Sequence, residues 1–262
     1  MIMYAVVMLA ALVVAALTLF SGFGIGMLLM PVFALFFPIE SAIIMTAVVH
    51  LSNNLFKLGI MGKYADWSIV WRFVLPGLVT SALGAYLLTR ISVSAPLWTY
   101  ELNGTREITI VKLVVAILMI FFALLELMPT KEKFKFSKRY IPLGGALSGF
   151  FGGLSGHQGA LRSAFLLRSI SDKTRFIGTG VVCAVVVDLA RLTVYGTSIS
   201  AGTLTIVSDS GGMNLIIAAT VTAFIGSFVG SRLMKKVKMI HVRNSVVGML
   251  LLLALLLGTG II

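Results

Sequence analysis

The sequence predicts an all-α polytopic membrane protein built from two inverted-topology repeats, each a re-entrant broken-helix hairpin followed by three transmembrane helices. Three observations predict this fold class. Of the 262 residues 59% are apolar and only 11% are charged, whereas soluble domains carry roughly 25% charged residues. Basic residues gather in short stretches between apolar segments, and two glycine clusters interrupt segments that are otherwise continuously apolar.

The predicted spans are the eight apolar segments close to or above the roughly 20 residues that a spanning helix needs: 2–37, 41–62, 73–90, 109–128, 140–167, 174–196, 213–232 and 244–262. Residues 1–20 lack the basic start of a cleaved signal peptide, so we assign them to the mature protein. The stretches 130–139 and 232–243 are strongly basic and are expected in the cytoplasm. The loop 197–212 has no basic residue and is expected outside, which places 168–175 inside.

Two of the eight segments cannot be simple crossings under this assignment. Segment 140–167 begins and ends inside, so it must turn back, and its turning point is the glycine cluster "GGLSGHQG" at 152–159. The same reasoning places 91–108 and both chain termini outside, and Lys63 with Arg72 inside. Segment 2–37 therefore also turns back, at Gly22–Gly26.

The two halves also resemble each other in sequence. An offset of 134 positions pairs Ser21-Gly22 with Ser155-Gly156, and an offset of 142 pairs Gly84 with Gly226. A rival register pairs "SGF" at 21 with "SGF" at 148. We expect a first repeat over 1–129, a basic cytoplasmic linker over 130–139 and a second repeat over 140–262. Three crossings per repeat would invert the second copy, as in many secondary transporters.

The glycine-rich segments resemble the sulfite exporter TauE/SafE family, also called the TSUP family of membrane anion permeases. "GFGIGMLLMP" at 22–31 and "GGLSGHQGA" at 152–160 occupy the places of the family's glycine-rich blocks, and the resemblance covers essentially the whole chain. The sequence departs from the family pattern at Ile25, where Gly is usual, and at "GHQGA", where Gly-Ile-Gly-Gly is more usual. The resemblance implies transport of sulfite or of small organosulfur anions such as sulfoacetate.

The first candidate binding residues lie at the two glycine breaks. A half-helix that restarts inside the membrane directs free N–H groups and its positive dipole end toward the midplane, which favours an anion. We expect substrate contacts from Ser21, Gly22, Phe23 and Gly24 in the first hairpin and from Ser155, Gly156, His157 and Gln158 in the second. The alternative is that these glycines only allow helices to pack closely.

The second group consists of polar residues within apolar segments, which normally face a cavity or the bundle interior. Four of them share one face of segment 41–62 by helical spacing, and three lie in later segments: His50, Asn53, Asn54 and Lys57, then Arg162, Asp188 and Arg191. The offset of 134 pairs Asn54 with Asp188 and Lys57 with Arg191. The alternatives are a network that only fixes packing, a helical Asp188–Arg191 salt bridge, and snorkelling of Lys57 and Arg191 to headgroups.

The predicted function is a secondary transporter of a small anion in the cytoplasmic membrane, working by alternating access. An anion channel of the same fold is the first alternative. An intramembrane enzyme is disfavoured because no HExxH, GxSxG or paired-Asp motif is present, and the lone Cys183 gives no metal or disulfide pattern. We therefore expect no cofactor. The expected partners are the anionic substrate and membrane lipids rather than nucleic acid, and a homodimer is compatible with the sequence. His50, His157 and Asp188 are the candidates for carrying a coupled proton.

Overall fold

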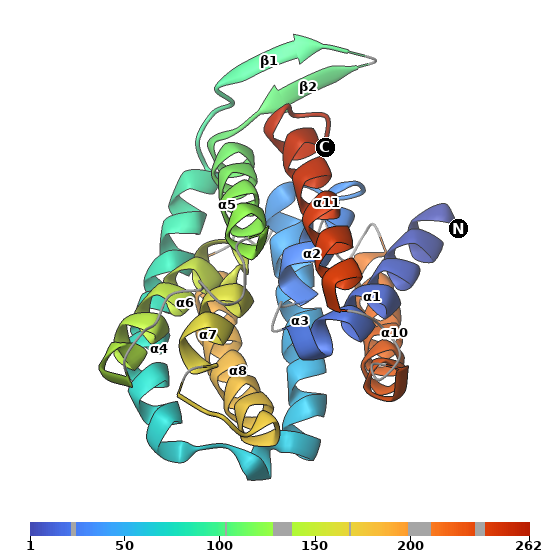
Figure 1. The fold of residues 1–262 in the computed structure, drawn as a ribbon. Coiled ribbons are helices and arrows are strands. Elements are labelled where there is room, and N and C mark those ends of the chain that lie inside the picture. Colours follow the sequence, from blue (N-terminus) through green and yellow to red (C-terminus); the bar gives the residue numbers. More distant parts are fainter. Residues whose placement is uncertain (22–24, 103, 128–137, 168, 199–210, 234–238) are drawn as a thin grey trace.

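The computed structural model describes residues 1–21, 25–102, 104–127, 138–167, 169–198, 211–233 and 239–262 (Figure 1). Nearly all of them are helical, and five helical stretches are long and apolar enough to span a membrane: Ile39–Tyr64, Trp67–Ser92, Ile110–Leu127, Lys173–Thr197 and Gly212–Gly230. The apolar stretches Ile2–Ala16 and Asn244–Gly258 belong to two further helices of 20 residues each. The prediction of an all-α polytopic membrane protein is confirmed.

The first half of the chain contains five helices and one β-hairpin among its described residues. They are α1 (Ile2–Ser21), α2 (Ile25–Ala34), α3 (Ile39–Met61), the 3-10 turn η1 (Gly62–Tyr64), α4 (Trp67–Ser92), β1 (Trp98–Glu101), β2 (Thr105–Ile108) and α5 (Ile110–Leu127). Helix α4 begins six residues before the segment predicted from residue 73. Asp66 caps its N-terminus by accepting a hydrogen bond from the Ile69 N–H at 3.3 Å, so the charged Arg72 lies inside the helix.

The second half follows the same order of helices. It contains the 3-10 turn η2 (Lys138–Tyr140), α6 (Ile141–Ser155), α7 (Gln158–Leu166), α8 (Lys173–Ser198), α10 (Gly212–Leu233) and α11 (Met239–Gly258). Two helix boundaries recur at the offset of 134 found in the sequence. Helix α1 ends at Ser21 and α6 at Ser155, and α3 begins at Ile39 and α8 at Lys173. The inverted relation between the halves stays a prediction.

The break between α6 and α7 lies within the predicted glycine cluster. Gly156 caps α6 in the left-handed region, with φ 81°, and donates its N–H to the Gly152 carbonyl at 3.0 Å. Helix α7 then folds back along α6. The Phe165 ring on α7 lies so close to Gly144 on α6 that a β-carbon there would be 2.3 Å from it. In the first half α2 packs against α1. Residues 22–24, which form the predicted turning point there, lie outside the described residues.

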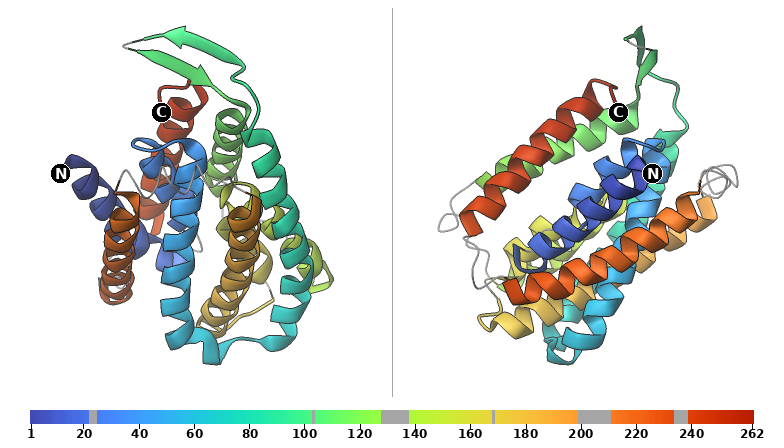
Figure 2. Two further views of the ribbon diagram at one scale, coloured as in Figure 1. Left: turned by 180° about the vertical axis from the view of Figure 1, so that it is seen from behind. Right: turned by 90° about the vertical axis from the view of Figure 1, so that its right-hand side faces the viewer.

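Two pairs of helices pack with their backbones in contact through glycine. On α6, β-carbons at Gly145, Gly149 and Gly153 would lie 2.0, 2.2 and 2.0 Å from the carbonyl oxygens of Phe73, Gly77 and Ser81 on α4. On α10, β-carbons at Gly226 and Gly230 would lie 2.2 and 2.6 Å from the carbonyl oxygens of Leu12 and Ala16 on α1. In each pair the residue numbers of the contacting positions rise together along both helices, so the two helices run parallel. The right-hand view of Figure 2 shows this for α1 and α10. The first helix of each half therefore packs on the fourth helix of the other half.

The described core is divided between two helix groups. The smaller hydrophobic cluster joins α4, α6, α7 and α8. The larger cluster is formed mainly by α1, α2, α3, α5, α10 and α11. Helix α3 of the larger group contacts α8 of the smaller group. The candidate site lies at this contact.

Segments that the charge analysis placed on the same side do contact one another. At the end of the molecule that carries the β-hairpin, Tyr100 Oη donates to the Thr259 carbonyl at 2.5 Å and Arg106 donates to the Ile261 carbonyl at 2.6 Å. At the opposite end, Arg175 forms a 2.9 Å salt bridge with Asp66. The β-hairpin in 91–108 was not predicted. Which of the two ends faces the cytoplasm stays a prediction.

Candidate functional site

Buried polar side chains of α3, α7 and α8 meet where α3 crosses α8. Every described polar side chain of the predicted site is at most 9% exposed: His50, Asn53, Asn54, Lys57, Ser155, His157, Gln158, Arg162, Asp188 and Arg191. Gly22, Phe23, Gly24 and the side chain of Ser21 lie outside the described residues. The sequence placed these polar groups within apolar helices, and the fold turns them inward rather than toward lipid.

The carboxylate of Asp188 is the centre of this group. His50 Nδ1 lies 2.6 Å from its Oδ2, and Asn54 donates to the same oxygen at 3.2 Å. Gln158 donates to Oδ1 at 2.9 Å. Arg191 reaches Oδ1 with Nε at 3.0 Å and with a second guanidinium nitrogen at 2.8 Å. Since a carboxylate offers about four lone-pair positions, these contacts fully occupy Asp188.

The contact between Asn54 and Asp188 joins residues separated by 134 positions, the offset at which the two halves match. Two residues related by a two-fold axis can touch each other only beside that axis. The contact therefore lies where the predicted repeat requires its axis, at the crossing of α3 and α8. Lys57 and Arg191, the other predicted pair, lie one helical turn farther along the same two helices.

The glycine break between α6 and α7 lies beside Arg191. Its Nη1 donates to the Gly152 carbonyl at 3.3 Å, and a β-carbon on Gly156 would lie 3.1 Å from the same nitrogen. A β-carbon on Gly26 would lie 3.1 Å from the Gly156 carbonyl oxygen, so the start of α2 directly approaches the break between α6 and α7. Close packing, the alternative proposed for the glycines, is thus present at Gly26 and Gly156.

Lys57 and Arg162 carry the positive charge that Asp188 does not neutralise. Among the described residues Lys57 Nζ has no hydrogen bond or ion pair, although Lys57 is only 9% exposed. The charges of Lys57 and Arg162 repel each other. Arg162 donates from Nη1 to the Gln158 side-chain oxygen at 3.1 Å. The described residues of the site therefore include three buried cationic side chains and one buried carboxylate.

Asn53 and His157 make their contacts outside the Asp188 network. Asn53 points toward α10, where its Oδ1 accepts a hydrogen bond from Ser227 at 2.9 Å. His157 Nδ1 lies 3.0 Å from the Ser155 carbonyl oxygen, and its ring stacks on Phe122 at 5.4 Å between centroids. His157 Nε2 and Asn53 Nδ2 are buried without a hydrogen-bond partner among the described residues.

Two alternatives from the sequence are now decided for Arg191. Its salt bridge with Asp188 at i and i+3 is confirmed. Snorkelling of Arg191 to headgroups is wrong, because its side chain is 1% exposed and bonded to the interior. Tyr195 was not predicted as a site residue. Its Oη donates a hydrogen bond to the Gly153 carbonyl. The signal was helical spacing, since Tyr195 follows Asp188 and Arg191 on one face of α8.

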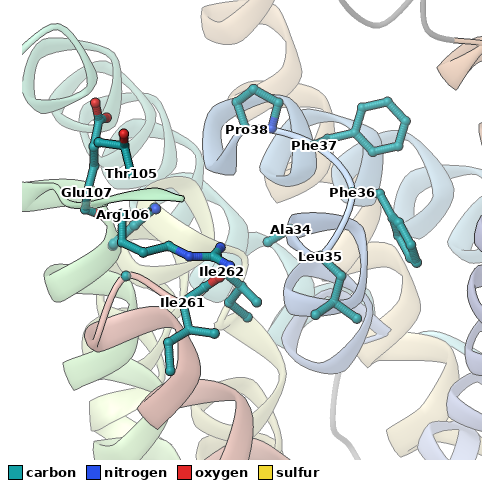
Figure 3. Close-up of a pocket in the computed structure, with 12 residues that line it drawn as sticks. Ala34, Leu35, Phe36, Phe37, Pro38, Thr105, Arg106, Glu107, Ile261 and Ile262 are labelled. Carbon is teal, nitrogen blue, oxygen red and sulfur yellow. Dashed lines mark hydrogen bonds between the residues drawn. The ribbon is translucent and has the colours of Figure 1, made fainter. Parts of the chain in front are cut away.

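A separate open pocket of about 340 Å³ lies at the end of the molecule that carries the β-hairpin (Figure 3). It is lined by the corner between α2 and α3, by β2 with Lys112, and by residues 260–262. Arg106 points across it toward Ile261, as the figure shows. No residue of the predicted site lines this pocket.

Comparison with protein families gives one match. The family model described as sulfite exporter TauE/SafE matches residues 7–257. No curated protein and no solved structure matches the chain.

Proposed function

The chain belongs to the sulfite exporter TauE/SafE family, and from that premise we propose that it is a secondary transporter of sulfite or of a small organosulfur or organic anion such as sulfoacetate. The family assignment and the long apolar helices identify a multi-pass membrane transport protein. The proposal adds the substrate class, the binding centre and the mechanism of alternating access in the cytoplasmic membrane.

The observation that carries the proposal is the excess of positive charge in the buried centre. Lys57, Arg162 and Arg191 are each at most 9% exposed, and Asp188 is the one buried carboxylate among the described residues. A buried cation without a counter-ion is costly in a membrane protein. A transported anion that enters the centre supplies the missing counter-charge.

The two half-helices supply further donors. Helix α7 begins at Gln158 and α2 at Ile25, and the first turn of α2 approaches the break before α7 where Gly26 meets Gly156. The first N–H groups of a helix have no partner within the helix and favour an anion. We place the anion between these helix starts and the side chains of Lys57 and Arg162.

Alternating access follows from how the helices group. The glycine contacts fix α6 on α4 and α1 on α10, so each tight pair combines helices from both halves of the chain. The polar contacts of Asp188 join α3 to α7 and α8, across the boundary between the two helix groups. We propose that the two groups tilt against each other at this boundary and expose the centre to one side at a time.

Reconstitution into liposomes tests the proposal. Purified protein is expected to take up labelled sulfite or sulfoacetate saturably, and unlabelled anion inside the vesicles should accelerate uptake by exchange. Arg162→Gln should abolish this uptake, whereas Arg90→Gln, at an exposed position near the end of α4, should leave it unchanged. Large unitary currents would instead identify a channel. Thermal stabilisation only by cations or neutral solutes would contradict the anion assignment.

A further inference from the structure

Asp188 has no capacity to neutralise a second cation in the centre. Its two oxygens receive contacts from His50, Asn54, Gln158 and Arg191 at 2.6 to 3.2 Å. Arg191 contacts one oxygen of Asp188, through a hydrogen bond from Nε at 3.0 Å and a salt-bridge contact from a terminal nitrogen at 2.8 Å, and charge-assisted contacts of this kind are stronger than those between neutral groups. The charge of Asp188 is therefore assigned to Arg191.

One carboxylate cannot balance Lys57, Arg162 and Arg191 together. Asp188 is the carboxylate that acts electrostatically on Arg162, and no described carboxylate acts on Lys57. Residues 22–24, outside the described residues, are Gly, Phe and Gly and bring no charged side chain. His50, whether neutral or protonated, adds no negative charge. When Lys57 and Arg162 are both protonated, the described part of the centre therefore carries two positive charges that no described carboxylate balances.

We infer that the centre selects anions that carry two negative charges over those that carry one, with Lys57 and Arg162 each matching one charge. The inference rests on the proposed function, and it assigns the charge of the substrate rather than its name. A dianion leaves the centre close to neutral. A monoanion leaves one buried cation unpaired, which costs binding free energy because that cation is held away from water.

The test compares two ligands that share a sulfonate and differ mainly in charge. Sulfoacetate carries two negative charges at neutral pH, and 2-hydroxyethanesulfonate carries one. Isothermal titration calorimetry on the full chain in detergent, at constant ionic strength, should give a dissociation constant for sulfoacetate that is lower by about tenfold or more. Equal affinity for the two ligands would overturn the inference without any variant.

Variants then locate the second charge. Lys57→Gln should raise the dissociation constant for sulfoacetate by about tenfold or more and leave that for 2-hydroxyethanesulfonate nearly unchanged. Lys57→Arg should keep the preference. Lys63→Gln, an exposed position in η1, is the matched control and should behave as the wild type.

The outcomes separate this inference from the proposed function. A preference for the dianion that survives in Lys57→Gln would remove Lys57 from the centre and overturn the charge assignment. Binding and transport of both ligands without preference would reject the dianion inference and leave the anion transporter intact. Failure of both ligands to bind, together with absence of anion transport, would reject both.

Discussion

At the scale of single residues, Asp188 connects α3, α7 and α8 through one side chain. It is fully buried and accepts from His50, Asn54, Gln158 and Arg191. Removing its charge would leave the Arg191 guanidinium buried without a counter-ion. A broken buried pair is far more costly than a broken surface pair, because the remaining charge cannot return to water.

Asp188→Asn is therefore expected to destabilise the protein by about 3 kcal/mol or more. The matched control is Asp66→Asn. Asp66 pairs with Arg175 at 2.9 Å, but their side chains are 22% and 57% exposed, so this loss should be within about 1 kcal/mol. Asn also preserves the cap that Asp66 gives to α4. Melting temperatures in detergent measure both changes, and equal effects would contradict the central role of Asp188.

The predicted polar face of α3 was correct in part, for a geometric reason. Adjacent residues on a helix point about 100° apart. Asn54 faces Asp188 on α8, whereas Asn53 turns to Ser227 on α10. Helical spacing showed that both residues are buried polar groups. Which neighbouring helix each one meets depends on packing between segments distant in sequence, which spacing does not encode.

At the scale of elements, the close contact of α4 with α6 depends on glycine. A β-carbon on Gly149 would lie 2.2 Å from the Gly77 carbonyl oxygen and 2.6 Å from the Thr80 hydroxyl. The Gly77 oxygen belongs to the backbone and cannot rotate aside, and the Thr80 hydroxyl is held by its hydrogen bond to the Ala146 carbonyl at 2.7 Å. A methyl group there must push the two helices apart.

Gly149→Ala is expected to destabilise the protein by about 2 kcal/mol through overpacking. The control is Gly248→Ala on α11, where nothing lies within 4 Å of the added β-carbon. That change should be neutral or slightly stabilising because alanine favours the helix. The test compares the melting temperatures of the two variants with that of the wild type. An unchanged melting temperature for Gly149→Ala would mean that α4 and α6 separate easily.

The β-hairpin shows how a local signal was overlooked. β1 and β2 pair antiparallel, with Trp98 opposite Ile108 and Glu101 opposite Thr105. The sequence between them contains Asn103-Gly104, the dipeptide most typical of a two-residue hairpin turn. Charge placement assigned 91–108 to one side of the membrane, but it carries no information about secondary structure within a loop. The α6–α7 break was found because charge placement required a reversal there.

At the scale of the whole molecule, charge placement and folding give separate constraints. The structure brings 62–66 beside 172–179 and the β-hairpin beside 259–262. These are the sets of segments that the positive-inside rule placed together. The contacts between helices are the same whichever end of the molecule faces the cytoplasm. That assignment depends on the basic residues of the connecting segments.

Single cysteines can test the direction directly, because the native Cys183 is the only cysteine in the chain and is fully buried. Ser94→Cys lies at an exposed position between α4 and the β-hairpin, and Ser171→Cys lies at an exposed position before α8. In intact cells a membrane-impermeant maleimide should label Ser94→Cys and not Ser171→Cys. Ser171→Cys should react only after the membrane is permeabilised. Wild-type protein, with Cys183 alone, should stay unlabelled in both conditions. The reversed pattern would place the basic end outside and invert the topology. Labelling of both variants in intact cells would contradict the re-entrant α6–α7 hairpin on which that topology depends.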